Sequence, residues 1–277
     1  MYQGKEYVLS NKRIVQKNDK TCDDDYFILS LFAIGKELAS RPSRPSRHIN
    51  KNKTLLIELL VGLPPLHYKS LNKKFKAYFT ERDKPIKFSL NGQPFSAIIG
   101  DAQVYPQSYA AALTAYEDIK KAPLVSVVDV GGYTVDCIRL ERMHTNMDVC
   151  TSLYRGVGTL FQKINEHIRA SGAQNLRDSV IENILLNDTK SMETYSQARI
   201  DLVKDLAQKF AAELLLEVAH TGLDLNEDLT VFVGGGALLL KEYLEKTGIV
   251  KKSLFVNDIH ANAKGYEIIY YAKKTKS

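Results

Sequence analysis

Two short apolar segments, each with glycines at or one residue after its end, constrain the fold of this chain more than any other feature. Leu124–Asp129 precedes Gly131-Gly132, and Thr230–Val233 precedes Gly234–Gly236. Short runs of β-branched and aliphatic residues that end at turn residues indicate buried strands. Glycines at a strand end let the backbone turn tightly and let its N–H groups approach a ligand. The two segments predict an α/β fold with a ligand site at strand ends.

The size and composition of the chain are those of a globular protein with two lobes. It has 277 residues, of which 44% are hydrophobic and 25% are charged. A chain of this length can form two lobes, each with its own core. The formal net charge of +6 is modest and gives only weak support for a nucleic-acid partner. Three cysteines without metal-ligand spacing indicate buried free thiols.

The chain lacks the sequence signals of membrane insertion or export. No apolar run approaches the roughly 18 residues of a membrane-spanning helix, and the first ten residues contain no signal-peptide pattern. We therefore expect a cytoplasmic protein with no membrane partner.

Hydrophobic periodicity and turn residues predict strands and helices in alternation, with both a hairpin and crossovers, so that the sheets are mixed. The expected elements in the first half are a helix over 25–40, a strand Thr54–Leu60, a lysine-rich helix with Leu71, Phe75, Tyr78 and Phe79 on one face, a hairpin of Ile86–Leu90 and Pro94–Ile99 around Asn91-Gly92, a strand Ala102–Val104 and a helix Ser108–Lys120. Those in the second half are a strand pair Leu124–Asp129 and Val135–Leu140, a mostly helical stretch Gly156–Ala219, a strand Thr230–Val233, a helix Ala237–Lys246, a strand Leu254–Val256 and a helix Ala261–Ala272.

A basic, proline-containing loop spans Arg41–Arg47. Because proline blocks helix formation, this segment is expected to be exposed and extended. Two interpretations stay open, a solvated connection and an arm that contacts phosphates.

The segment Val127–Asp136 combines the features of a phosphate-binding loop. Its strand places the carboxylate of Asp129 at the strand end, where it can hold a water molecule of a bound metal ion. Thr134 can add a hydroxyl group. The alternative is a hairpin turn in which Asp129 caps the backbone without any ligand.

Two further segments fit the same site. Three glycines at 234–236 leave the backbone bare where a flat or anionic ligand can lie, although a Rossmann fingerprint is absent. Gln107 follows Pro106 at the end of a predicted strand and, taken alone, is an ordinary turn residue. We expect Gln107, Asp129 and Gly234–Gly236 to converge in the folded chain.

In this order the motifs resemble those of the bacterial actin-like ATPases of the ParM/StbA plasmid-segregation family. The resemblance covers most of residues 1–272 and rests on Val61–Pro64, Pro106-Gln107, the segment VVDVGGYTVD, the segment VFVGGGALLL and Ala261–Tyr266. It implies an actin-like, ribonuclease-H-like fold of two lobes with mixed sheets. The expected lobes are 1–121 and 122–272, followed by a tail over 273–277.

The resemblance also implies roles for single residues. Asp129 matches the aspartate that positions Mg²⁺ through water. Gln107 lies where many bacterial relatives carry a catalytic Glu and actin carries Gln, which can orient the attacking water. The residues matched to nucleotide binding are Asp129, Gly131, Gly132, Tyr133 and Thr134 around the phosphates, Gly156 and Gly158 at a helix-opening turn, and Gly234, Gly235 and Gly236 beside the adenosine. The implied cofactors are ATP or GTP with Mg²⁺, bound between the two lobes.

One family motif has no match in the sequence. Members begin with a strand and an Asp-x-Gly turn that forms a first phosphate loop, and nothing before Asp129 has this form. Instead, Met1–Tyr7 resembles a strand pair from further inside a complete member. We expect either a truncated sequence or a protein that has lost half of its phosphate clamp, with impaired ATP hydrolysis and filament formation.

Three functions are consistent with these motifs. The first is a filament-forming actin-like ATPase of plasmid or DNA segregation, whose partners are further copies of itself and a DNA-binding adaptor. The second is a catalytically silent interaction fragment of such a protein. The third is a small-molecule kinase of the same superfamily, which is disfavoured because no cluster of polar substrate-binding residues is evident.

Overall fold

The computed structural model describes residues 1–10, 17, 19–40, 54–82 and 84–275. These residues form two compact units, of which the first comprises Met1–Leu63 and His67–Tyr105 and the second Pro64–Leu66 and Pro106–Ser277. The lobes expected from the sequence, 1–121 and 122–272, stay a prediction. The Arg41–Arg47 loop lies outside the described residues. None of the described helices is long and apolar enough to cross a lipid bilayer.

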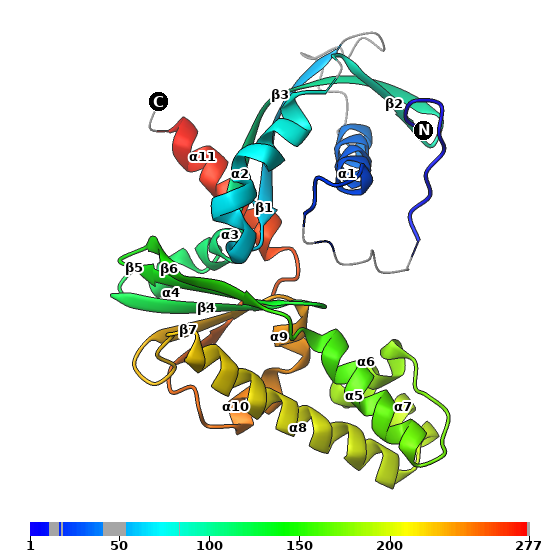
Figure 1. Cartoon of the computed structure of the whole chain (residues 1–277), viewed down its shortest axis with the longest axis vertical. Helices are drawn as coiled ribbons and strands as arrows, with labels where there is room; N and C mark the ends of the chain where they lie inside the picture. The colour runs from blue at the N-terminus through cyan, green and yellow to red at the C-terminus, as the bar shows by residue number, and fades with distance from the viewer. Residues whose placement is uncertain (11–16, 18, 41–53, 83, 276–277) are drawn as a thin grey trace. The chain divides into compact units, whose positions relative to one another are not determined.

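The first unit is a three-stranded sheet with two long helices (Figure 1). In chain order its elements are α1 (Asp25–Ser40), β1 (Leu55–Leu63), α2 (Pro65–Thr80), β2 (Ile86–Leu90) and β3 (Gln93–Pro106). The strand order is β1-β3-β2, and β2 pairs with β3 in antiparallel register through the Asn91-Gly92 turn. Both turn residues have positive φ, as a two-residue hairpin turn of this type requires. The predicted hairpin is therefore confirmed.

Aromatic side chains fill the core of the first unit. Phe27 of α1 is fully buried and contacts the rings of Tyr2, Tyr78 and Phe79. Helix α1 approaches β2 closely at Gly35, where a Cβ atom would stand 3.1 Å from the Leu90 side chain. The predicted helix over 25–40 is thus confirmed, and its apolar stripe faces the sheet.

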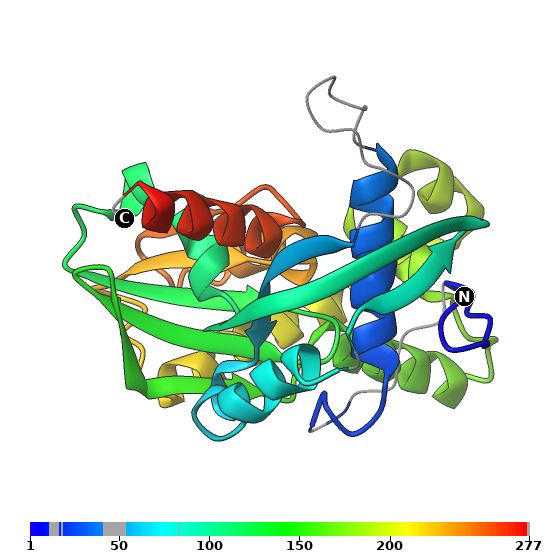
Figure 2. The same ribbon diagram turned by 90° about the horizontal axis from the view of Figure 1, so that it is seen from above.

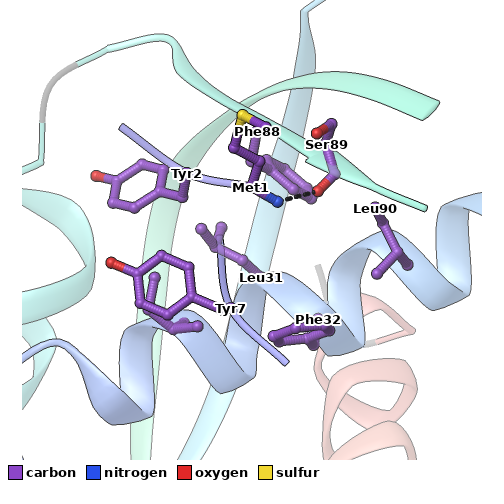
Figure 3. Close-up of a pocket in the computed structure, with 9 residues that line it drawn as sticks. Met1, Tyr2, Tyr7, Leu31, Phe32, Phe88, Ser89 and Leu90 are labelled. Carbon is purple, nitrogen blue, oxygen red and sulfur yellow. Dashed lines mark hydrogen bonds between the residues drawn. The ribbon is translucent and has the colours of Figure 1, made fainter. Parts of the chain in front are cut away.

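The first residues of the chain close one side of this core. The Met1 ammonium group donates a hydrogen bond of 2.7 Å to the carbonyl oxygen of Ser89, and Tyr2 forms bridges to Lys5 and Phe88. Figure 3 shows Tyr2 and Tyr7 beside Phe32 and Leu31 of α1 around a small apolar pocket. The N-terminal segment is therefore packed on its own unit.

The second unit is a five-stranded mixed sheet covered by helices on both faces (Figures 1 and 2). Its elements are α3 (Tyr109–Leu113), α4 (Tyr116–Ile119), β4 (Leu124–Val130), β5 (Val135–Glu141), β6 (His144–Leu153), α5 (Val157–Ala170), α6 (Asp178–Leu185), α7 (Thr189–Thr194), α8 (Gln197–His220), β7 (Leu229–Val233), α9 (Gly235–Leu239), α10 (Lys241–Lys246), β8 (Ser253–Phe255) and α11 (Ala261–Lys274). The order is β6-β5-β4-β7-β8, in which β6, β5 and β4 are antiparallel and β4, β7 and β8 are parallel.

Alternate residues of β4 face the two helical layers. Val128 and Val130 belong to the core formed with α5, α6 and α8. Val125 and Val127 belong to the opposite core, formed with α3, α4 and the start of α11. Because successive side chains of a strand point to opposite faces, Asp129 lies on the side of α3 and α11.

Several sequence predictions need correction. The three cysteines are free thiols, but Cys22 is exposed and Cys150 is partly buried, so that Cys137 alone of the three is buried as expected. The two strands predicted at Pro94–Ile99 and Ala102–Val104 are one continuous strand, β3, which runs through Gly100. A Cβ atom at Gly100 would stand 2.7 Å from the Leu56 side chain, so glycine lets Leu56 pack against the strand at this point. The helix predicted over Ser108–Lys120 is two short helices, since the Thr114 hydroxyl bonds to the Ala111 carbonyl oxygen at the end of α3.

The helix predicted over Ala237–Lys246 begins earlier, at Gly235, and is interrupted at Leu240, whose side chain is fully buried and whose dihedrals are φ −99° and ψ 6°. Strand β6 is not predicted by the sequence at all. It carries few apolar residues, and its turn from β5 uses Arg142 and Met143 at positive φ in place of glycine or asparagine.

Candidate functional site

Asp129 and Gly234, two residues of the predicted site, lie in the second unit at the ends of the neighbouring parallel strands β4 and β7. Asp129 is paired in register with Val233, so Asp129 and Gly234 leave the sheet side by side. A Cβ atom on Gly234 would stand 2.4 Å from Asp129 Oδ1, and Gly234 has a φ of +89°. Only glycine fits here, because the position combines a left-handed backbone with the Asp129 carboxylate as its neighbour.

The loop after β4 is a tight turn held by the beginning of α5. The Gly131 N–H donates to the Thr134 carbonyl oxygen at 2.9 Å. The N–H groups of Gly156, Val157 and Gly158 donate in turn to the carbonyl oxygens of residues 133, 131 and 132, at 2.9, 3.1 and 2.9 Å. The loop is therefore fixed by three hydrogen bonds from one helix end.

Gly156 and Gly158 hold the loop through their backbone hydrogen bonds. Their N–H groups point at the loop carbonyls, so these groups support the loop and are not available to a phosphate. A Cβ atom on Gly156 would stand 2.5 Å from the Gly132 carbonyl carbon and from the Tyr133 nitrogen. The role that the sequence suggests for these glycines, contact with the nucleotide, stays a prediction.

Three other N–H groups of the loop can serve as donors. Among the described residues, no backbone acceptor lies opposite the N–H groups of Gly132, Tyr133 and Thr134. Tyr133 has 41% of its surface exposed. Consecutive backbone N–H groups without a partner form an anion-binding concavity. The turn can therefore receive a phosphate without any charged side chain.

Burial and an amide neighbour determine the state of Asp129. Burial raises the pKa of this carboxyl group, and a hydrogen bond from the Asn262 side chain opposes the shift. Asn262 Nδ2 lies 3.3 Å from Asp129 Oδ2. Because the amide is neutral, it orients the carboxylate without cancelling its charge.

A second acidic residue lies directly opposite Asp129 in the sheet. Asp136 of β5 is its register partner and is 6% exposed. Cross-strand partners in an antiparallel pair point to the same face, so two carboxyl groups share this side of the sheet. Asp136 was part of the motif but was not assigned a role from the sequence.

Gln107 is linked to Asp129 by the hydrogen bond of the next residue, Ser108, to Asn262. The Ser108 N–H donates to Asn262 Oδ1 at 3.1 Å, and Asn262 in turn contacts Asp129. Asp129 and the residue after Gln107 are thus bound to one side chain. The segments of Gln107, Asp129 and Gly234 thus lie close together in the second unit, and the roles assigned to them stay a prediction. Asn262 lies in Ala261–Tyr266, one of the segments that carry the family resemblance, but the sequence assigned it no role; its bonds join residues that are distant along the chain.

The other two glycines after β7 differ from each other. A Cβ atom on Gly236 would stand 2.6 Å from the Val130 carbonyl oxygen, so Gly236 allows close packing on β4. A Cβ atom on Gly235 would stand 3.9 Å from the Ile259 side chain, which is an ordinary van der Waals distance. Gly235 therefore leaves open space over the backbone.

Part of the second unit matches a known protein family. Residues 127–246 match the family described as archaeal actin homologue MreB-like, C-terminal. No curated protein matches the sequence.

Solved structures of actin homologues are similar over nearly the whole chain. The archaeal actin homologue Ta0583 superposes with a TM-score of 0.66 at 17% identity, covering 90% of this chain and 77% of the other. Its complex with ADP gives a TM-score of 0.62 at 20% identity, with 87% and 75% covered.

Two ParM proteins are similar to the same extent. The apo ParM protein of pSK41 gives a TM-score of 0.66 at 16% identity, with 96% and 75% covered. A ParM from a 15-stranded filament of Clostridium botulinum gives 0.65 at 16% identity, with 94% and 76% covered. This chain therefore has an actin-like fold, and the α/β class expected from its sequence is confirmed.

Proposed function

We propose that this chain is an actin-like nucleotide-binding protein of the filament-forming type. One observation carries the proposal. The Asp129 carboxylate, the turn Gly131–Thr134 and Gly234 lie together at the ends of β4 and β7. Three N–H groups of this turn meet no backbone acceptor in the part of the chain that the structure describes. Ligands of open α/β sheets gather at such strand ends.

Each part of the site has one task in this proposal. The N–H groups of Gly132, Tyr133 and Thr134 bind phosphate oxygens, which carry the negative charge of the nucleotide. The adenosine lies over the open backbone at Gly235. ADP in the complex of the archaeal homologue supports a nucleotide as the ligand.

The residues present also fit Mg²⁺. This ion keeps several of its water molecules and takes one or two carboxylates together with phosphate oxygens. Asp129 supplies one carboxylate and Asp136 lies opposite it, whereas no group of three or more His, Cys, Asp or Glu among the described residues forms a metal cage. When bound, the ion neutralises phosphate charge, and Asp129 orients its water shell.

Gln107 is proposed to orient the attacking water if the nucleotide is hydrolysed. A carboxamide cannot take up a proton as a carboxylate does, but it can position water, so hydrolysis is expected to be slow. The filament-forming ParM of the comparison supports self-association as the biological use. Plasmid or DNA segregation through a DNA-binding adaptor belongs to the same proposal.

Calorimetric titration with ATP and with GTP, each with Mg²⁺, tests the central claim. The wild type should bind at least one of them, Asp129→Ala should lose Mg²⁺-dependent binding, and Gln107→Ala should keep it. Asp205→Ala, at an exposed position of α8, is the matched acidic control and should bind as the wild type does. Equal binding by Asp129→Ala and the wild type would refute the assigned roles.

A second set of measurements addresses the ligand pose and the assembly. Gly235→Ala should fold normally, because a Cβ atom there meets no atom closer than 3.9 Å, and should bind nucleotide more weakly if adenosine covers this backbone. Sedimentation and electron microscopy with Mg²⁺ and nucleotide test for filaments. Failure of the wild type to bind either nucleotide would favour the silent interaction protein instead.

A further inference from the structure

Asn262 uses both ends of its side-chain amide within the site. It is the second residue of α11, and its Nδ2 group donates to Asp129 Oδ2 at 3.3 Å. Its Oδ1 atom accepts the N–H of Ser108 at 3.1 Å. One side chain thus joins the end of β4 to the segment that carries Gln107, from positions 133 and 154 residues away.

The backbone at Ser108 depends on this contact. Ser108 has a φ of 72°, a conformation that non-glycine residues adopt only when the surroundings impose it, and its side chain is fully buried. The side chain of Ser108 therefore cannot turn to water, and its N–H needs an acceptor inside the protein. Asn262 Oδ1 supplies that acceptor.

The position of Asn262 is itself fixed by helix packing. A Cβ atom on Gly265, one turn further along α11, would stand 1.8 Å from the Ala110 carbonyl oxygen of α3. The two helices therefore touch backbone to backbone. With α11 held in this way, the Asn262 amide has little freedom to move away from Ser108 and Asp129.

We propose that Asn262 is a positioning residue that holds the Asp129 carboxylate in the orientation needed for the Mg²⁺ water shell and fixes the Gln107-Ser108 backbone at the same time. This proposal rests on the proposed nucleotide function. It assigns no contact between Asn262 and the nucleotide. Residues that orient a metal-binding group typically change metal affinity by about 10- to 100-fold when they are removed.

Two substitutions separate the two bonds. Asn262→Ala removes both the donor to Asp129 and the acceptor for Ser108. Asn262→Asp keeps an acceptor of the same shape for the Ser108 N–H, but it replaces the donor with a carboxylate beside Asp129. If orientation of Asp129 is the function, both variants lose it, whereas only the alanine variant loses the Ser108 contact.

The chain supplies a close control. Asn165 of α5 also uses its whole amide, donating to the Leu176 carbonyl oxygen at 3.0 Å and accepting the Leu176 N–H at 2.8 Å. It is in the same unit but contacts no residue of the site. Asn165→Ala should therefore lower stability without any effect on the role of Mg²⁺.

The experiment compares ADP and ATP affinity with Mg²⁺ and with EDTA for the wild type and the three variants. The ratio of the two affinities measures how much Mg²⁺ strengthens binding. We expect this ratio to fall about 10-fold or more in Asn262→Ala and Asn262→Asp, while affinity in EDTA stays within about twofold. Asn165→Ala should keep the wild-type ratio.

Hydrogen exchange in the nucleotide-free protein gives a readout that does not depend on the ligand. The amide of Ser108 should exchange faster in Asn262→Ala than in the wild type, and Asn262→Asp should retain its protection. An unchanged Mg²⁺ ratio in both variants would overturn the assignment of Asn262 while leaving nucleotide binding intact. A wild type that binds no nucleotide would instead overturn the proposed function, and with it this proposal.

Discussion

Asp129 and Gly234 leave two adjacent parallel strands so close together that a methyl group on Gly234 would stand 2.4 Å from Asp129 Oδ1. The backbone at Gly234 therefore packs directly against the Asp129 carboxylate. This contact explains why a buried strand of aliphatic residues must end in glycine here, and it makes the packing of the site sensitive to single methyl groups.

Gly234→Ala should destabilise the second unit and abolish nucleotide binding. The variant combines a left-handed backbone with a collision against Asp129 Oδ1 and the Val130 carbonyl oxygen. We expect the free energy of unfolding to fall by about 2 to 4 kcal/mol. Gly248→Ala is the matched control, because Gly248 also has positive φ, +65°, but no atom within 4 Å of the Cβ position.

Urea unfolding followed by circular dichroism compares the two variants. Gly248→Ala should lose only the backbone term, about 1 to 2 kcal/mol, and should keep nucleotide binding. Equal losses in the two variants would show that the contact with Asp129 adds nothing to the cost.

Gly156→Ala should disturb the phosphate-binding turn more than it disturbs the fold. Its Cβ atom would stand 2.5 Å from the Tyr133 nitrogen and 2.6 Å from the Gly131 carbonyl oxygen, so the turn must move away from α5. Gly156 has φ −72°, which alanine tolerates. We expect nucleotide affinity to fall at least about 10-fold, because the N–H groups that receive phosphate shift with the turn.

Titration calorimetry of Gly156→Ala, beside its melting temperature, checks this expectation. A variant that melts as the wild type does and binds nucleotide with unchanged affinity would show that the turn adapts without loss.

Much of the site could be predicted from the sequence because its parts have strong local signals. The aliphatic run before Asp129 and the glycines after it indicate a strand and a turn whatever the remainder of the chain does. The same holds for Val233 and Gly234. Ligands of α/β sheets bind at the carboxyl ends of strands, and both strands end in glycine-containing turns. The sequence therefore predicts that Asp129 and Gly234 lie near each other.

The rest depends on contacts that no local pattern records. Asn262 is one polar residue near a helix start, and its contacts with Ser108 and Asp129 form only when α11 packs on α3. Strand β6 was missed because Arg142 and Met143 adopt positive φ without a turn residue. Tertiary packing imposes that conformation, whereas the sequence rule relies on glycine or asparagine.

The stability of the first unit should depend on pH through Asp19. Hydrogen bonds from Lys74, at 2.6 Å, and from Thr21 lower the pKa of Asp19 to about 2. In the unfolded chain this pKa is about 3.9. The native state therefore gains stability from the ionised group above about pH 4, and this gain is lost as the pH falls through about 2.

Asp19→Asn should remove this dependence. The variant should be less stable than the wild type near neutral pH, by less than about 1 kcal/mol because the pair is partly exposed to solvent, and the difference should shrink as the pH is lowered from 5 to 2. Denaturation at several pH values measures it. A difference that grows in acid would mean that Asp19 does not have a lowered pKa.

The last prediction concerns the end of the second sheet that lies away from the site. Asp228 precedes β7 and is 2% exposed, and its Oδ2 atom accepts hydrogen bonds from the Ser126 hydroxyl at 2.7 Å and from Arg139 at 3.1 Å. Asp228→Ala leaves the guanidinium of Arg139 without this carboxylate, and we expect a loss of about 3 to 5 kcal/mol in unfolding free energy.

Ser126→Ala removes one neutral donor and should cost about 1 kcal/mol. A double-mutant cycle over Arg139→Ala and Asp228→Ala isolates the ion pair, since the second substitution should add little once the first has been made. The network joins β4 to the start of β7, and the proposed nucleotide site lies at the other end of both strands. The nucleotide affinity of the folded Asp228→Ala variant should therefore equal that of the wild type. Additive losses in the cycle would show that Asp228 and Arg139 stabilise the sheet independently of each other.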